Sequence, residues 1–292
     1  MKAWAVDKPA REIGFTLTPQ KSFLKLARDH IPTACSAVGV NSKNEVFLFH
    51  RGPRPIQCFD SEGKFLRAWG DDVIKIAHGL RIDGDDNVWV TDVGGHRVFK
   101  FDSTGKPLLA LGTGEPGTGN DQFDEPTDIA FGSGGEVYVS DGYGNSRVMK
   151  FDVDGRFLSS WGTPGEGRGQ FHLPHSIIVD SEGRVLVGDR ENNRIQVFDG
   201  DGAWLATWKG FAPYGIALDS DGRVFVADGR AAQVLLLDDK GKVRKRWGRF
   251  GEGVGQFQMP HMLAFDGDGN LFVAEVDGKR LQKYVRKTNP QP

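Results

Sequence analysis

Residues 78–92 read HGLRIDGDDNVWVTD, and this stretch has the pattern of a β-hairpin. An apolar run leads into a polar turn of aspartate and glycine, and a second run with β-branched and aromatic residues ends on an acidic residue. A turn of this composition between two such runs is typical of hairpins. The sequence therefore predicts two paired strands, with His78 opening the first and Asp92 closing the second.

The same hairpin pattern recurs along the chain, with a constant separation of 14 positions between its first and last residues. The additional copies open and close at Ser36 and His50, Thr127 and Asp141, His175 and Asp189, Tyr214 and Asp228, and His261 and Glu275. The copy at Ser36 is degenerate. Self-similarity of this kind indicates a repeat architecture in which each copy is one structural unit.

Two further apolar runs follow the hairpins, as in residues 97–102 and 108–112 after the first quoted copy. Four antiparallel strands per copy make one blade of a β-propeller. Six copies therefore predict an all-β, six-bladed propeller, with residues 1–292 forming a single domain.

The last copy lacks an apolar run for its fourth strand, because residues 285–292 are polar. The N-terminal segment 1–35 carries two apolar runs outside the repeats, at 13–17 and 23–26. We expect a strand from residues 13–26 to complete the last blade beside residues 281–284. Such a strand closes the ring and removes an exposed sheet edge.

The amino-acid composition limits the kinds of partner that the chain is expected to bind. Lysine and arginine number 37 against 39 aspartates and glutamates, which argues against a chain built chiefly to bind nucleic acid or an anionic membrane. The basic run 240–247 fits a charged outermost strand better than an RNA-binding surface. No stretch has the roughly 20 apolar residues of a membrane helix.

Cys35 and Cys58 are too few for a disulfide framework, and the first residues lack the apolar core of a signal peptide. We therefore expect a soluble, cytoplasmic protein, and a monomer.

The residue that opens each hairpin is expected to face the central channel. Histidine occupies this position in alternate blades, about 120° apart in a six-fold ring, although the chain holds only 7 histidines. Three imidazoles that converge on one axis form a His₃ metal site with an open position, and this ligand set favours zinc. Histidines that only fill the channel or form hydrogen bonds are the alternative. The six channel positions in chain order are Ser36, His78, Thr127, His175, Tyr214 and His261.

Loops that follow the second strands bring further polar residues to the same end of the channel. Arg51 and Arg190 are suited to hold a carboxylate through paired hydrogen bonds, and Tyr143 is suited to proton transfer beside a metal. Arg147 and Arg194 fit better as structural residues of their blades.

Several of these segments resemble peptidyl-α-hydroxyglycine α-amidating lyases, a family of NHL-type six-bladed propellers. The resemblance spans nearly all six copies, and it implies that His78, His175 and His261 bind zinc. It also implies that Arg51 holds the substrate carboxylate and stabilises the transition state, and that Tyr143 is the catalytic base. The segments that carry the resemblance are 49–52, 78–80, 89–93, 141–147, 174–176 and 189–192.

Two positions depart from that family. Gly144 stands where family members carry a disulfide-forming cysteine, which is consistent with reducing surroundings. Met262 follows the third histidine, where the family has an aspartate that helps to hold structural calcium, and this puts calcium in doubt. The turn 266–270 resembles the start of an EF-hand loop but lacks the later glutamate and the flanking helices, so we expect a hairpin turn there.

The sequence thus predicts a zinc-dependent lyase that cleaves N-acyl-α-hydroxyglycines to an amide and glyoxylate. Its expected partner is a small or peptide-like substrate with a carboxylate, held by Arg51 and Arg190. Two alternatives stay open. One is a different metal-dependent reaction such as lactone hydrolysis, which would favour carboxylate ligands around calcium. The other is a non-catalytic NHL interaction scaffold, which would not need histidines in alternate blades.

Overall fold

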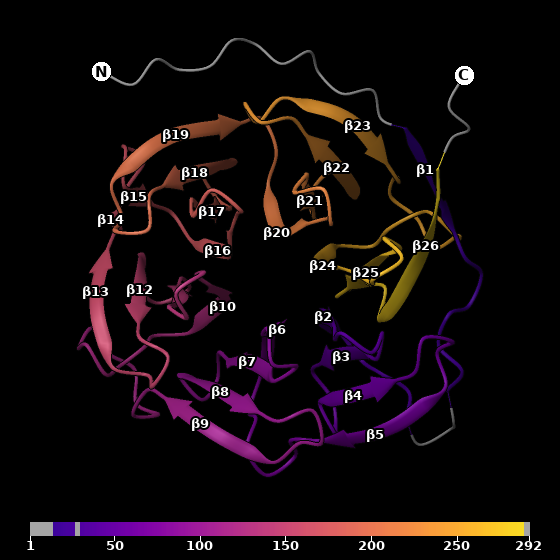
Figure 1. Ribbon diagram of the computed structural model, residues 1–292, viewed down its shortest axis with the longest axis horizontal. Helices are drawn as coiled ribbons and strands as arrows, with labels where there is room; N and C mark the ends of the chain where they lie inside the picture. Colours follow the sequence, from indigo (N-terminus) through magenta and orange to yellow (C-terminus); the bar gives the residue numbers. More distant parts are fainter. Residues whose placement is uncertain (1–13, 27–29, 289–292) are drawn as a thin grey trace.

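A computed structural model describes residues 14–26 and 30–288, and this part of the chain is built from strands without a helix. Six four-stranded antiparallel sheets are arranged in a ring around a central axis (Figure 1). In blades 1 to 5 the first strand of each sheet is innermost and the fourth is at the rim, whereas in blade 6 the N-terminal strand takes the rim position. The prediction of an all-β, six-bladed propeller is confirmed. Among the described residues there is also no helix that could cross a membrane.

The strands of the first three blades follow the chain order. Blade 1 contains β2 (Cys35–Val40), β3 (Val46–His50), β4 (Ile56–Phe59) and β5 (Phe65–Trp69). Blade 2 contains β6 (Ala77–Ile82), β7 (Val88–Asp92), β8 (Arg97–Phe101) and β9 (Pro107–Leu111). Blade 3 contains β10 (Pro126–Phe131), β11 (Val137–Asp141), β12 (Arg147–Phe151) and β13 (Phe157–Trp161).

The remaining blades include the closure of the ring. Blade 4 contains β16 (Pro174–Val179), β17 (Val185–Asp189), β18 (Arg194–Phe198) and β19 (Trp204–Lys209). Blade 5 contains β20 (Pro213–Leu218), β21 (Val224–Asp228), β22 (Gln233–Leu237) and β23 (Val243–Trp247). Blade 6 contains β24 (Pro260–Phe265), β25 (Leu271–Glu275), β26 (Arg280–Thr288) and β1 (Phe15–Pro19). The short strands β14 (Thr163–Pro164) and β15 (Gln170–Phe171) pair in the loop before blade 4.

The N-terminal strand β1 completes blade 6, as predicted. It pairs antiparallel with β26, from Phe15 opposite Thr288 to Pro19 opposite Tyr284. One detail of the prediction is wrong, because the third strand does not end near Tyr284 but continues to Thr288. Residues 285–288 are accommodated because their backbone pairs with β1 and Arg286 forms ion pairs with Asp219 and Asp221 of blade 5. Residue 13 of the expected run lies outside the described residues.

An aspartate at the start holds the hairpin turn in blades 2, 4, 5 and 6. The Asn87 backbone N–H donates to Asp83 Oδ1 at 2.9 Å, and the Asp83 N–H donates to the Asn87 carbonyl at 3.0 Å. Asp266 makes the same pair of bonds with Asn270, at 2.8 and 3.1 Å. The aspartates are therefore turn residues, and the 266–270 segment is a hairpin turn as predicted.

The hydrophobic core lies between neighbouring blades. Phe47 of blade 1, for example, is buried in one cluster with Val88 and Phe101 of blade 2. The basic run predicted at the rim forms β23, the outermost strand of blade 5. Cys35 and Cys58 are buried free thiols. This packing joins rigid blades side by side and fixes the positions at which their inner strands begin.

Candidate metal centre

A β-bulge opens the innermost strand of every blade. In blade 2 the register shifts between Ala77 and Leu80, and the inner strands of the other five blades shift at the corresponding place. A bulge re-aims the extra residue away from the regular pleat. Each bulge contains the residue that the 14-residue spacing assigns to the channel, so the repeat itself produces a ring of six inward positions.

The three histidines at alternate bulges converge. His78, His175 and His261 are buried, and one nitrogen from each lies within 4.8 Å of the others. The Nε2 atoms of His78 and His175 are 3.1 Å apart. Two nitrogen ligands on a tetrahedral zinc, with bonds of about 2.0–2.1 Å, lie about 3.3 Å apart. The separation and the donor chemistry both fit a bound transition metal.

The orientation of each imidazole is set by the following blade. The Nδ1 of His78 lies 2.7 Å from the Thr127 carbonyl, that of His175 lies 2.7 Å from the Tyr214 carbonyl, and that of His261 lies 2.6 Å from the Ser36 carbonyl. A carbonyl oxygen only accepts, so each Nδ1 must carry the hydrogen and each Nε2 keeps its lone pair for a metal. Blades without a channel histidine therefore orient the histidine of the preceding blade.

Electrostatics keeps these imidazoles neutral. Burial lowers the pKa of His78 and His175 well below the usual range, and neighbouring imidazoles and arginines lower it further. Burial likewise lowers the pKa of His261 to about 3. Neutral imidazole is the form that coordinates a metal, so the three ligands need no deprotonation near neutral pH.

Tyr143 reaches the histidines from the loop after β11. Its hydroxyl lies 3.1 Å from His78 Nε2 and 3.2 Å from His175 Nε2, while its ring is partly exposed at the mouth of the channel. Burial of the hydroxyl raises the Tyr143 pKa, and the charges of Arg190 and Arg51 act against this increase. The structure thus brings Tyr143 to His78 and His175, at the same end of the channel as the sequence predicts.

The two candidate carboxylate-binding arginines approach from opposite blades. Arg51 follows β3, is exposed, and donates from Nε to the Ala77 carbonyl at 3.3 Å. Arg190 follows β17 and donates from Nη1 to the Tyr143 hydroxyl at 3.4 Å. Blades 1 and 4 are diametrically opposed, so the two guanidinium groups flank the mouth of the channel.

Sequence reasoning did not foresee the contacts of Arg190 with its neighbours, and it missed Arg230 altogether. Glu191 forms ion pairs with both Arg190 and Arg230, and the Tyr214 ring lies under the Arg190 guanidinium. The pattern Asp-Arg-Glu at 189–191 was visible in the sequence, but the contact with Arg230 joins loops of two blades. The role of Tyr214 also depends on a contact between blades.

Arg147 and Arg194 are structural, as predicted. Arg194 Nε donates to Asp189 Oδ2 at 2.7 Å, and its Nη atoms donate to the carbonyls of Glu166, Gly167 and Gln170. Arg147 makes the corresponding bonds to Asp141 and to the loop before blade 3. Each arginine therefore ties the loop that enters its blade to the buried aspartate of the second strand.

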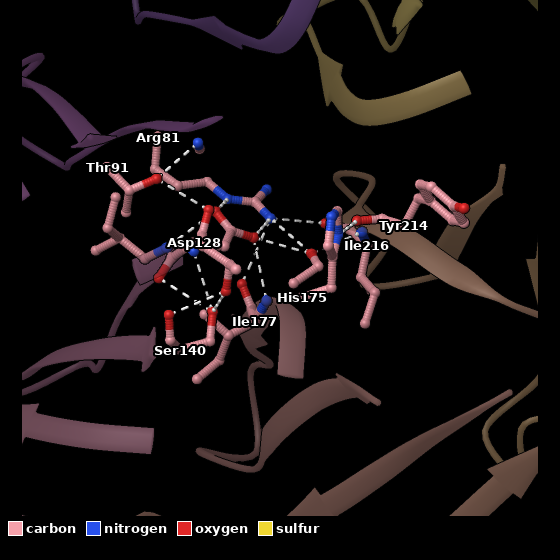
Figure 2. Close-up of polar contacts among 12 residues, drawn as sticks. Arg81, Thr91, Asp128, Ser140, His175, Ile177, Tyr214 and Ile216 are labelled. Atoms are coloured by element: carbon pink, nitrogen blue, oxygen red, sulfur yellow. Dashed lines mark hydrogen bonds and ion pairs between the residues drawn. The ribbon is translucent and has the colours of Figure 1, made fainter. Parts of the chain in front are cut away.

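A second buried network crosses the channel beyond the histidines (Figure 2). Arg81 of blade 2 donates from Nε to Asp128 Oδ1 of blade 3 at 3.0 Å, and from Nη2 to the Ile216 carbonyl of blade 5 at 3.0 Å. Ser176 donates to Asp128 Oδ2 at 2.9 Å. Met262 is buried in a hydrophobic cluster and offers no carboxylate to the channel.

Comparison with known proteins places the chain among propellers of one repeat type. Residues 76–101, 123–151 and 171–198 match the NHL repeat. The mouse NHL repeat-containing protein 3 is 34% identical over 281 residues, which cover 88% of this chain and 81% of the mouse protein. The chain belongs to the NHL-repeat family.

Relatives of this NHL-repeat protein include amidating lyases, which confirms the resemblance. Peptidyl-alpha-hydroxyglycine alpha-amidating lyase 1 of Drosophila melanogaster is 32% identical over 287 residues, which cover 86% of this chain and 53% of the fly protein. The NHL-repeat chain thus spans about half of that relative.

Solved structures share the fold of this NHL-repeat protein. A streptogramin B lyase superposes with a TM-score of 0.68 at 17% identity, covering 94% of this chain and 98% of the other. A gluconolactonase from Xanthomonas campestris gives 0.67 at 13% identity, covering 96% and 99% of the two chains. The names differ while the fold is the same, so the site has to be judged by its own residues.

Proposed function

We propose that this NHL-repeat protein is a zinc-dependent lyase that cleaves N-acyl-α-hydroxyglycines to an amide and glyoxylate. The observation that carries the proposal is the convergence of His78, His175 and His261, with the Tyr143 hydroxyl in contact with two of them. Similarity to the fly protein, whose name states this chemistry, supports the choice of reaction.

The reaction balances without an oxidant or a reductant. The hydroxyl, the amide nitrogen and the carboxylate of the substrate are all bonded to one carbon. Loss of the hydroxyl proton allows the C–O bond to become the aldehyde C=O while the C–N bond breaks. The departing nitrogen takes up a proton and leaves as the amide, and the carbon fragment leaves as glyoxylate.

The residues around the histidines match these needs. Zinc held by the three Nε2 atoms would supply a Lewis acid. We assign to Tyr143 the transfer of the hydroxyl proton to the departing nitrogen, because its oxygen lies beside two Nε2 atoms and Arg190 Nη1. Burial raises the Tyr143 pKa, so this role requires the phenolate, which the charges of Arg190 and of a bound zinc would favour. Arg51 and Arg190 supply positive charge for the carboxylate from two sides.

Two measurements on the purified protein test the proposal. Elemental analysis should find about one zinc per chain, because the site offers one set of three imidazoles. The zinc-loaded protein should release glyoxylate from N-benzoyl-α-hydroxyglycine and from other N-acyl-α-hydroxyglycines. A metal-loaded protein that releases no glyoxylate from any member of this series would contradict the lyase proposal.

Lactone hydrolysis is the main competing function. The three histidines offer only nitrogen donors, whereas calcium prefers several oxygen ligands. This donor set favours the lyase over a calcium-dependent lactonase. If the protein hydrolysed lactones and released no glyoxylate, the lactonase would be favoured over the lyase. A protein with neither activity and no bound metal would instead favour an interaction scaffold.

A further inference from the structure

Arg190 is held in one orientation by its surroundings. Its Nε donates to Glu191 Oε1 at 2.8 Å, and its guanidinium carbon lies 4.8 Å from the centre of the Tyr214 ring and 5.5 Å from that of Tyr143. The Arg190 side chain is 15% exposed. A guanidinium fixed in this way loses little conformational freedom when it binds an anion, so it is prepared for a carboxylate.

Glu191 holds Arg190 without cancelling the positive charge of the mouth. Its second oxygen pairs with Arg230, whose Nη1 also donates to Asn193 Oδ1 at 3.0 Å. Burial favours the neutral form of Glu191, but the two arginines outweigh burial and lower its pKa. Two guanidinium groups around one carboxylate leave a net charge of about +1, which attracts a substrate anion.

Tyr214 provides the surface on which Arg190 lies. The Tyr214 ring lies between two of the histidines, with its centre 5.4 Å from that of His175 and 6.0 Å from that of His261. Gly229 makes room for this ring, since a Cβ at that position would lie 2.6 Å from a ring atom. Stacking of a guanidinium on an aromatic face restrains its plane as well as its position.

We propose that Glu191 and Tyr214 are positioning residues that hold Arg190 as the main binding group for the substrate carboxylate. The inference rests on the proposed function for the identity of the substrate. Carboxylate binding, however, can be measured without turnover. Any ligand of the site is then expected to carry an anion at the side of blades 4 and 5, where Glu191, Tyr214 and Arg230 surround Arg190.

The experiment compares two non-cleavable ligands on the zinc-loaded protein by titration calorimetry. N-benzoylglycine carries the carboxylate but lacks the hydroxyl, and N-benzoylglycinamide replaces the carboxylate with a neutral amide. The unmodified protein should bind the acid at least about 10-fold more tightly than the amide, because a charged hydrogen bond is lost in the amide. Equal binding of the two ligands would overturn the proposal.

The variants then assign that preference to the two positioning residues. Glu191→Gln and Tyr214→Leu should each reduce the preference for the acid several-fold while zinc content is retained. Because Glu191→Gln also raises the net positive charge beside Arg190, a reduction in that variant reports lost positioning and not lost charge. Tyr214→Phe should retain the preference because the ring face is kept. Glu182→Gln, the same change on an exposed turn of blade 4, is the matched control.

A double-variant comparison separates positioning from a general effect on the site. In an Arg190→Ala background, Glu191→Gln should have no further effect on the preference for the acid. An undiminished effect in that background, or equal weakening of acid and amide binding, would overturn the proposal. If the acid is preferred but no N-acyl-α-hydroxyglycine is cleaved, the lyase proposal fails and the carboxylate site stands.

Discussion

The Nδ1 atom of His261 donates to the carbonyl oxygen of Ser36, 2.6 Å away and 225 positions earlier in the chain. This bond joins the last blade to the first across the point where the ring closes. The third metal ligand therefore acquires its orientation only when blades 1 and 6 meet. Assembly of the metal centre and closure of the propeller are parts of one structural event.

Loss of one imidazole should release the metal. We expect His175→Ala to lower the zinc content from about one per chain to a small fraction, because catalytic zinc sites keep three protein ligands and this one would retain two. His172→Ala, three positions earlier and exposed, is the control and should keep its metal. Full zinc content in the His175 variant would show that the site is elsewhere. The zinc content of both variants is measured by elemental analysis after dialysis.

Truncation of a buried side chain in the closing strand should destabilise the whole ring. Phe15 is 2% exposed and packs with residues of blades 5 and 6. We expect Phe15→Ala to lower the free energy of unfolding by about 3–5 kcal/mol, whereas the exposed neighbour Thr16 should tolerate alanine. Thermal and urea unfolding of the two variants give the comparison. An unchanged melting temperature for Phe15→Ala would mean that β1 does not contribute to stability.

Removal of the Tyr143 hydroxyl should separate chemistry from metal binding. Tyr143→Phe keeps the ring beside His78 and His175, so zinc should stay bound, while turnover should fall about 10²-fold or more if the hydroxyl transfers the proton. Tyr138→Phe removes a hydroxyl of the same blade that donates to the Gly200 carbonyl, far from the histidines, and should preserve turnover. Equal rates for the Tyr143 variant and the unmodified protein would exclude the hydroxyl from the reaction.

Removal of the buried Arg194 side chain should destabilise the fold, whereas removal of the exposed Arg156 side chain should have little effect. Arg194→Ala leaves Asp189 buried without its ion pair and leaves the Glu166 and Gly167 carbonyls without this donor, so we expect a loss of about 3–5 kcal/mol in unfolding free energy. Arg156 pairs with aspartates at the surface, and its removal should cost about 0–1 kcal/mol. Similar losses for the two variants in urea unfolding would contradict the structural role of Arg194.

Local patterns in the sequence predicted the blades and the channel positions well. The hairpin at residues 78–92 contains its own turn chemistry, and a constant spacing places equivalent residues at equivalent bulges. This is why the spacing alone was enough to identify His78, His175 and His261 as neighbours. Most of the contacts that the sequence did not reveal cross between blades, as in the bonds from histidine Nδ1 atoms to carbonyls of the next blade.

The contacts of Glu191 could likewise be predicted only in part from the sequence. Its pairing with Arg190 joins sequence neighbours, but its pairing with Arg230 depends on the angle between blades 4 and 5. The extension of β26 to Thr288 was not predicted for a related reason, because a polar strand can form when a partner strand satisfies its backbone.

The side chain of Arg81 runs from blade 2 to Ile216 of blade 5, on the opposite side of the ring, with Asp128 and Ser176 packed against it. Arg81 lies further along β6 than His78, whereas Tyr143 and Arg190 belong to loops at the other end of the inner strands. The crossing side chain therefore narrows the axis on the side away from Tyr143 and Arg190. Substrate entry and product release are then expected on the side of Tyr143 and Arg190, so slow release of the product would delay binding of the next substrate.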